Sequence, residues 1–321
     1  MRSRLEAWTR ARGCRLACCE PDAVTHALEH LVSLRGAGRF DALFYERSLA
    51  WFESTPAGIR PDDRSILLIA VPRPAHLVTF EYRGRSHELL LPPTYYDYTG
   101  FFEEVRSDLD AYLEGRLPLR LVKAPYKTLV TRTGFARYGR NNITYLRGLG
   151  SYVQWMVFAT SMRIAGPVLE EIREPRMLER CRRCEACRKT CPSRAIGSER
   201  FLLEAENCVT WFSEFEGPLP DAFGAARRPC LVGCMACQEA CPANAGLLRL
   251  EKLAVRFTEE ETTFLLGEAS MGGESDGRRD ESSVRTSAAE KLARLRCSGW
   301  SMSPSGPPAD FRRNLAAVLR H

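Results

Sequence analysis

Apolar residues recur with the spacing of an α-helix near both ends of the chain. In residues 23–34, the apolar side chains of Val24, Ala27 and Leu31 fall on one face, as expected for a helix with one buried side. We predict that the first sixty residues as a whole are helical. The same spacing predicts further helices over residues 100–114, 247–263 and 310–320.

Short apolar runs between these segments predict β-strands. Residues 65–71 form a continuous apolar run that ends at Pro72, the pattern of a strand buried on both faces. Residues 76–82 and 86–91 are two strand-like runs joined by a glycine turn, which predicts a β-hairpin. Residues 152–158 predict one more strand. This order of elements predicts an open α/β (α+β) domain with a β-hairpin.

A glycine- and asparagine-rich stretch separates the later predicted strands. A helix is expected to end at Gly134, where glycine suits a C-terminal cap. Residues 139–142 then read Gly-Arg-Asn-Asn, a composition that allows the backbone to approach a ligand closely. An ordinary turn is the alternative interpretation.

The middle of the chain carries a doubled cysteine motif. The first copy runs C-x2-C-x2-C-x3-C-P from Cys181 to Pro192, and the second repeats C-x2-C-x3-C-P from Cys234 to Pro242. This spacing is typical of bacterial proteins with two [4Fe–4S] clusters, in which the fourth cysteine of each run binds the other cluster. It assigns Cys181, Cys184, Cys187 and Cys241 to cluster 1, and Cys191, Cys234 and Cys237 to cluster 2.

Cluster 2 needs a fourth thiolate, and the spacing leaves two candidates. Cys230 makes a loop one residue longer than usual before Cys234, whereas Cys208 comes from a separate segment. Structural zinc is the alternative for the whole array, because four-cysteine zinc sites also use C-x2-C pairs. The additional cysteine at the same spacing and the two C-P endings are not needed for zinc, so the motif favours iron–sulfur clusters.

The motif divides the chain into three predicted regions. An α/β domain covers residues 1–170, and a bacterial-ferredoxin-like double [4Fe–4S] domain covers residues 171–250. A short helical tail over residues 251–321 follows. Its stretch of about 268–290 is rich in glycine, serine and charge, so we expect it to be mobile.

Other potential metal ligands lie near the N-terminus. His26 and His30 are spaced to share one helix face, but no third ligand is close in sequence, so we interpret them as surface histidines. Cys14, Cys18 and Cys19 show no partnered metal spacing and are interpreted as incidental thiols.

Composition indicates a globular protein of more than one domain. The chain has 321 residues, 45% hydrophobic and 27% charged. No apolar run approaches the length of a membrane span, and no apolar region follows the early arginines as in a secretory signal. Because cluster thiolates also favour a reducing compartment, we expect a cytoplasmic protein without a disulfide framework or a membrane partner.

Basic residues gather in two parts of the chain, within a net charge of +6. One set lies in residues 116–147, which contain no acidic residue: Arg116, Arg120, Lys123, Lys127, Arg132, Arg137, Arg140 and Arg147. The other surrounds the first cysteine motif: Arg180, Arg182, Arg183, Arg188, Lys189 and Arg194. They form either a solvated face that offsets cluster charge, or a docking surface for nucleic acid or for an acidic electron donor such as flavodoxin or ferredoxin.

Three segments resemble the epoxyqueuosine reductase family and its paralogues with a double [4Fe–4S] domain. They read RTGFARYGRNN over residues 132–142, GSY over residues 150–152 and GCMACQEACPAN over residues 233–244. The similarity covers about residues 65–250. Cys208, followed by Val-Thr-Trp-Phe, also resembles the isolated cysteine of the family, which favours Cys208 over Cys230 as the fourth ligand of cluster 2.

The resemblance implies a corrinoid-dependent reductase. In this family an N-terminal α/β domain holds cobalamin without a histidine below the cobalt, two clusters relay single electrons to it, and reduced cobalt attacks an epoxide on a modified tRNA nucleoside. None of the five histidines lies in residues 124–244, in agreement with this. By position, the corrinoid would be bordered by Tyr138, Gly139, Arg140, Asn141 and Asn142.

Two departures from the family point towards a paralogue. The acidic residue that the family places three residues before the proline matching Pro125 is Val122 here, which cannot donate a proton. Residues 251–321 are also too short for the helical-repeat domain with which the family grips tRNA. If the chain does act on tRNA, Tyr96, Asp97 or another group would supply the proton.

Three hypotheses for function follow. The leading one is an iron–sulfur reductase that passes electrons through two [4Fe–4S] clusters, and on to cobalamin, for a reductive step on an unknown substrate. The second is epoxyqueuosine reductase itself, acting on tRNA. The third is a ferredoxin-like electron carrier whose N-terminal domain only docks partners.

Overall fold

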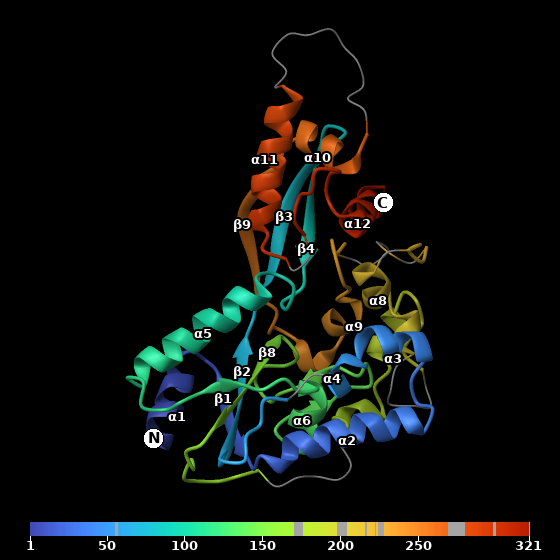
Figure 1. The fold of residues 1–321 in the computed structure, drawn as a ribbon. Coiled ribbons are helices and arrows are strands. Elements are labelled where there is room, and N and C mark those ends of the chain that lie inside the picture. Colours follow the sequence, from blue (N-terminus) through green and yellow to red (C-terminus); the bar gives the residue numbers. More distant parts are fainter. Residues whose placement is uncertain are drawn as a thin grey trace.

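The chain folds into two sheet-centred parts with the cysteine-rich segments beside them (Figure 1). The computed structural model describes residues 1–54, 57–169, 176–197, 204–215, 217–221, 223, 228–268, 280–297 and 300–320. No helix in these ranges is long and apolar enough to cross a membrane.

The first sheet is antiparallel throughout, in the strand order β1-β2-β8-β5. Its central strands are β2 (Ser65–Pro72) and β8 (Val153–Thr160), both predicted from their apolar runs. They pair along their whole length, from Ser65 opposite Thr160 to Pro72 opposite Val153. The edge strands are β1 (Arg15–Cys19) and β5 (Arg120–Leu121).

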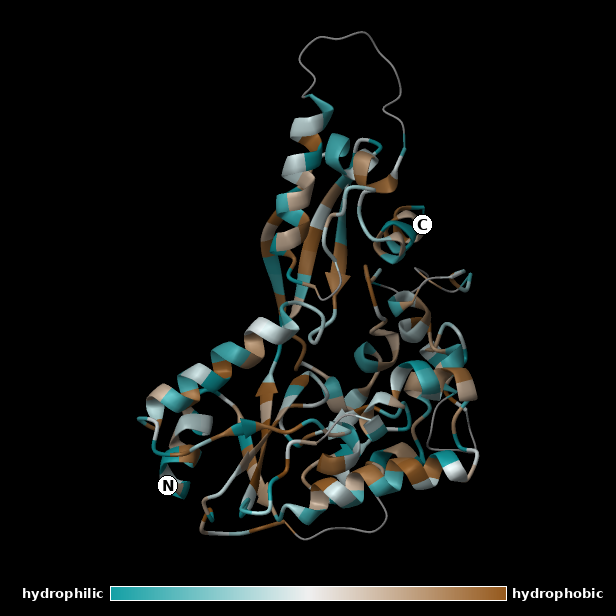
Figure 2. Cartoon of the chain, viewed as in Figure 1, coloured by the Kyte–Doolittle hydropathy of each residue, from teal (hydrophilic) through white to brown (hydrophobic). Residues whose placement is uncertain are grey.

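Both faces of this sheet are covered, which explains its continuous apolar runs. Ile66 and Leu68 join a core with α2 (Asp22–Gly36) and α6 (Tyr126–Arg132), while Leu67 and Ile69 join another with α1 (Arg2–Ala11) and α5 (Tyr98–Tyr112). Successive residues of a strand point to opposite faces, so every position of β2 up to Val71 is buried. The strands are mostly hydrophobic in Figure 2, whereas α2 alternates in hydropathy along its length.

The second sheet joins the predicted hairpin to the C-terminal region. The hairpin strands β3 (Ala75–Tyr82) and β4 (Arg85–Leu91) are confirmed, and β9 (Leu250–Phe257) adds to β3 in parallel. Three helices complete this part: α10 (Glu259–Leu266), α11 (Glu281–Arg294) and α12 (Ala309–Leu319). One continuous core includes Phe80, Phe257, Leu292 and Phe311.

Three predictions about local structure were wrong. The predicted helix over residues 247–263 is β9 followed by α10; Val255 and Phe257 are buried while Arg256 between them is exposed, which is strand periodicity. The helical reading of the first sixty residues missed β1. Within the stretch predicted to be mobile, residues 281–290 belong to α11, which buries Val284 and Ala288; residues 269–279 lie outside the described ranges.

The other predicted helices are found near their expected positions. Helix α2 contains residues 23–34, α5 covers most of residues 100–114, and α12 corresponds to residues 310–320. Helix α6 ends just before Gly134, whose φ is +71°. The division of the chain at residues 170 and 250 stays a prediction; the hairpin, which precedes both boundaries, shares its core with the region after them.

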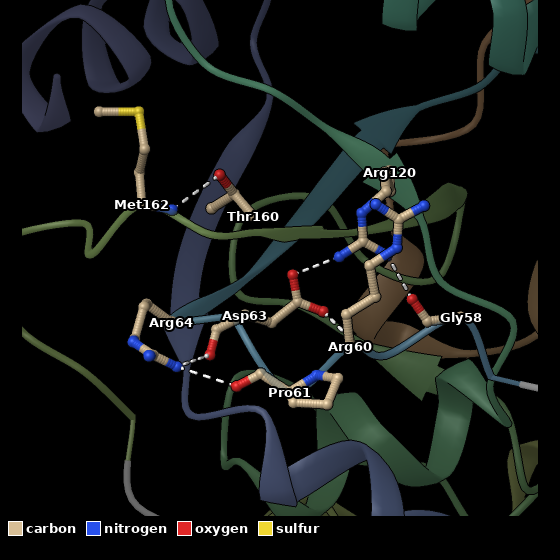
Figure 3. A network of polar contacts seen from close by, with 8 residues as sticks. All are labelled: Gly58, Arg60, Pro61, Asp63, Arg64, Arg120, Thr160 and Met162. Atoms are coloured by element: carbon tan, nitrogen blue, oxygen red, sulfur yellow. Dashed lines mark hydrogen bonds and ion pairs between the residues drawn. The ribbon is translucent and has the colours of Figure 1, made fainter.

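A buried carboxylate ties the entry of β2 to the edge strand β5 (Figure 3). Asp63, whose side chain is 0% exposed, forms an ion pair with Arg120 and accepts a hydrogen bond from the Arg60 backbone N–H (2.7 Å). Arg120 also donates to the Gly58 carbonyl (2.5 Å). Desolvation opposes the ionised form, but the hydrogen bonds from Arg120 and Arg60 outweigh it, and the pKa of Asp63 is lowered.

We expect Arg120→Leu to destabilise the fold by about 3 kcal/mol, because it leaves a buried carboxylate without its cation. Chemical denaturation near pH 7 measures the change. A lowered carboxyl pKa stabilises the protein above the ordinary value of about 4. The difference between the wild type and the variant should therefore shrink as the pH falls through the lowered pKa of Asp63.

Arg106→Leu is the matched control, since its pair with Glu103 is exposed on both sides and should contribute less than about 0.5 kcal/mol. Equal losses in the two variants would contradict a structural role for the buried pair.

Candidate iron–sulfur and ligand site

Short helical turns present the cysteines of the two motifs. Cys181 lies in the 3-10 turn Glu179–Arg182, and Cys187 in α7 (Ala186–Thr190). Cys237 lies in α9 (Ala236–Glu239), and Cys241 directly precedes the turn Pro242–Asn244, with Pro242 in its first position. Proline suits this position because no backbone N–H is needed there.

The cysteines assigned to cluster 1 line one small cavity, called here the cluster 1 cavity. Its walls include Cys181, Cys184, Cys187 and Cys241, together with Arg140. Arg140 donates to the Cys181 carbonyl (2.7 Å) and so joins the 139–142 loop to this motif. The last cysteine of the second motif therefore meets the first three cysteines of the first motif, as the spacing requires.

The cysteines assigned to cluster 2 line a second cavity of about 250 Å³, called here the cluster 2 cavity. Cys191, Cys234 and Cys237 share it with Cys208. Cys208 is placed by α8 (Val209–Glu214), whose N-terminal cap it forms. Cys230 is not among its walls; it packs with Leu90 and Met235 in a separate apolar core. This geometry favours Cys208 as the fourth ligand, and the ligand assignment stays a proposal.

The thiols fall into two sets of four, with one set in each cluster cavity. A zinc ion needs four sulfurs each at about 2.3 Å from one centre. A cubane holds its thiolates around a larger object, so two sets of four cysteines lining two cavities fit the iron–sulfur reading.

Burial keeps the thiols protonated in the absence of metal. Desolvation raises the pKa of Cys187 and of Cys234 to about 11, and it raises that of Cys237 well above the ordinary value. Since iron binds thiolates, cluster assembly releases these protons.

An amide network holds the second motif against the first sheet. The Asn244 side chain accepts from the Ser151 backbone N–H (2.9 Å) and donates to the Ser151 hydroxyl (2.8 Å) and to the Gln238 carbonyl (2.9 Å). A Cβ on Gly150 would lie 2.3 Å from the Asn244 oxygen. The close packing explains why the GSY and GCMACQEACPAN segments occur together.

A third and larger cavity of about 490 Å³ lies beside the cluster 2 cavity, and Thr94 lines both. We call it the large cavity. Aromatic residues from several elements form much of its wall, among them Phe44 of α3 (Ala42–Ser48) and Trp155 of β8. Its size is in the usual range for ligand pockets.

The polar groups of the large cavity include amides and lysines beside several hydroxyl groups. Gln154 is 2% exposed and its Oε1 has no hydrogen-bond partner; the Nδ2 of Asn142 is likewise unpaired. Lys127 Nζ lies 3.5 Å from Asn142 Oδ1. Although part of its side chain is exposed, desolvation lowers the pKa of Lys127 against the attraction of Cys208 and Glu214. No Asp or Glu is among the described residues that line this cavity.

The five residues predicted to border a corrinoid are divided among the cavities. Tyr138 and Asn142 line the large cavity, whereas Gly139 and Arg140 line the cluster 1 cavity. Asn141 lines both cluster cavities. A short ribbon of β6 (Arg137–Tyr138) and β7 (Thr144–Tyr145) carries the loop. Corrinoid contact by these residues stays a prediction.

The large cavity contains residues that the sequence alone did not single out. His30, interpreted as a surface histidine, is half-buried and lines the wall; it is carried there by α2, far from the cysteines in sequence. Gln154 lies in β8, whose apolar sequence pattern predicts a strand in the hydrophobic core. Tyr96 and Asp97 do not line the cavity, and Asp97 pairs with Arg296 (2.7 Å) instead.

Val122, at the family's acidic position, is also outside this wall. It is completely buried in the core under the first sheet, and its N–H donates to the Val157 carbonyl (2.9 Å).

Comparison with known proteins defines the class first. A family profile described as a 4Fe-4S double cluster binding domain matches residues 180–244. This region is therefore a double [4Fe–4S] domain, and the predicted fold class, with mixed α/β structure before this domain and a helical C-terminal region after it, is confirmed.

The particular relatives are epoxyqueuosine reductases. The protein from Staphylococcus aureus is 26% identical over 214 residues, which cover 63% of this chain and 54% of that protein. The protein from Synechococcus sp. is 38% identical over 66 residues, 20% of each chain. This chain thus spans about half the length of the S. aureus relative that it matches.

Solved structures of epoxyqueuosine reductase share the fold. The structure from Bacillus subtilis matches with a TM-score of 0.64 and 20% identity, covering 99% of this chain and 81% of that one. A structure with an epoxyqueuosine-modified tRNA stem loop matches with a TM-score of 0.63 and 19% identity, covering 99% and 80%. The resemblance seen in the sequence is confirmed in both sequence and fold.

Iron content separates the two candidate ligands of cluster 2. We expect Cys208→Ala to lower the iron content from about eight to about four per chain, because cluster 2 loses a thiolate. Cys230→Ala is the matched control and should keep about eight. Iron analysis of anaerobically reconstituted protein measures both, and loss of iron from the Cys230 variant alone would reverse the assignment.

Proposed function

We propose that this protein is an iron–sulfur reductase that carries electrons through two [4Fe–4S] clusters to a cofactor or substrate in the large cavity. The observation that supports it most is the serial arrangement of the cavities. Asn141 lines both cluster cavities, and Thr94 lines both the cluster 2 cavity and the large cavity. Electrons would pass from cluster 1 to cluster 2 and then to the large cavity.

Cobalamin is the cofactor proposed for the large cavity. The unpaired Gln154 Oε1 and Asn142 Nδ2 offer an acceptor and a donor to the amide side chains of a corrin, and the aromatic wall suits its apolar ring. When bound, cobalamin would supply a strongly nucleophilic, reducible metal centre. The residues present therefore fit the group.

The chain's own residues would orient the ligand and supply a proton. Gln154 and Asn142 would hold polar groups of the ligand at the wall. Lys127 would hold a proton at Nζ, and its lowered pKa makes that proton easier to release than that of an ordinary lysine. No carboxylate lines the described wall, so Lys127 would take the place of an acidic residue there.

An acidic electron carrier is the proposed donor. Arg180 lines the cluster 1 cavity, and Arg182 and Arg183 beside it are exposed. Exposed basic residues next to a cluster would attract a flavodoxin or ferredoxin.

Epoxyqueuosine in tRNA remains a second candidate substrate. It is favoured by the shared fold with a reductase solved with a modified tRNA stem loop. Turnover of that tRNA by the reconstituted protein would select this substrate. Cobalamin binding without such turnover would support a paralogue with another substrate.

Cobalamin binding tests the proposed cofactor directly. We expect anaerobically reconstituted protein to bind added hydroxocobalamin, and Gln154→Leu to weaken binding about tenfold, since a lost hydrogen bond in a buried site is worth about 1.4 kcal/mol. Spectrophotometric titration measures it. His30→Gln is the control for ligation: the Co(II) resonance should be unchanged, because no histidine is proposed below the cobalt. Absence of binding by the wild type would exclude the corrinoid reductase and leave the electron carrier.

Lys127 has a separate test that does not depend on activity. Its lowered pKa means that the folded protein disfavours the charged ammonium. We therefore expect Lys127→Met to raise the melting temperature near pH 7. The gain should shrink as the pH rises from the lowered pKa towards the ordinary value of about 10.4, since wild-type Lys127 then loses its charge. Lys123→Met, which removes another ammonium from the same wall, is the matched control, and equal changes in the two variants would contradict a specific effect at Lys127.

A further inference from the structure

Asn141 occupies a special position between the two cluster cavities. Among the described residues that line either cavity, it is the one that lines both. Its side chain is buried, at 2% exposed. A buried amide placed there is close to both sets of cysteines, and the low local dielectric strengthens its hydrogen bonds.

The orientation of the Asn141 amide follows from its neighbours. The backbone N–H of Ile143 donates to Oδ1 (3.3 Å), so the opposite side of the amide carries Nδ2. One Nδ2 hydrogen is donated to the Tyr145 hydroxyl (2.9 Å). The other Nδ2 hydrogen is left for the cluster 2 cavity, whose wall Asn141 shares with Cys237.

Tyr145 extends the contact to the other cluster. Tyr145 lines the cluster 1 cavity together with Cys241. Since the Tyr145 hydroxyl oxygen accepts from Asn141, its own hydrogen is available for the Cys241 sulfur.

The backbone leaves room for this pair. A Cβ on Gly139 would lie 2.5 Å from Asn141 Oδ1 and 2.6 Å from the Tyr145 ring. Glycine at this position therefore permits the close packing of Asn141 on Tyr145.

We propose that Asn141 and Tyr145 form a hydrogen-bonded bridge that sets the difference in reduction potential between the two clusters. Asn141 acts on cluster 2 through Cys237, and Tyr145 acts on cluster 1 through Cys241. A donor to a ligand sulfur stabilises the more negative, reduced cluster and so raises its potential. Both are positioning residues that act through the thiolates.

The inference rests on the proposed cluster ligands, and its failure is distinguishable from theirs. If the wild type does not assemble two [4Fe–4S] clusters, as iron content and electron paramagnetic resonance show, the proposed function fails. If both clusters form and the variants below leave the potentials unchanged, only the bridge fails.

Redox titration of the reconstituted full chain, followed by electron paramagnetic resonance, tests the bridge. Asn141→Ala should lower the midpoint potential of cluster 2 more than that of cluster 1. Tyr145→Phe should lower that of cluster 1 more than that of cluster 2. In the double variant the shifts should not be additive, because the two side chains share a hydrogen bond.

Two matched controls come from the same loop and ribbon. Asn142→Gly keeps the left-handed backbone (φ +57°) and removes an amide that lines only the large cavity. Tyr138→Phe removes a hydroxyl on the neighbouring strand. Both should leave both potentials unchanged. If Asn141→Ala fails to assemble its clusters, Tyr145→Phe, which deletes one oxygen, tests the proposal alone. Equal shifts of both potentials in that variant, or no shift of either, would overturn the proposal.

Discussion

The amide of Asn244 joins the two halves on which the site depends. It bonds to both the backbone and the hydroxyl of Ser151, two residues before β8, and to the carbonyl of Gln238 in the second cysteine motif. Each of these polar groups is buried or nearly so, and an unsatisfied group there would cost about 1–3 kcal/mol. The network therefore fixes the cysteine helices against the central strand of the first sheet.

This docking determines the order of the cavities. With the second motif held beside β8, Cys237 and Asn141 share the wall of the cluster 2 cavity, and Thr94 borders both this cavity and the next. The loop at residues 139–142 lies where the three cavities meet, so some of its residues line the cluster cavities and Asn142 lines the large cavity. The loop at residues 139–142 and the docking of the second motif beside β8 together place the three cavities in a series.

The electrostatics of the path change along its length. Arginines border the cluster 1 cavity, whereas the large cavity combines Lys127 with unpaired amides and lacks acidic residues in its described wall. Burial opposes charge throughout, for the thiols as for Lys127. Groups kept ionisable in such surroundings are expected at functional sites.

The cluster cysteines could be predicted from their spacing, because a cluster is bound by local loops whose ligand geometry depends on only a few residues between cysteines. The strands β2 and β8 could be predicted because burial on both faces of a sheet requires a continuous apolar run. Strand β9 was misread as helix, since most of its residues are exposed and its pairing partner β3 lies about 175 residues earlier. The position of Cys208 beside Cys191 and the arrival of His30 and Gln154 at one cavity are likewise products of long-range packing. The sequence by itself thus determined the chemistry of the clusters, whereas tertiary structure decided what surrounds them, because packing partners distant in the chain leave no local signal.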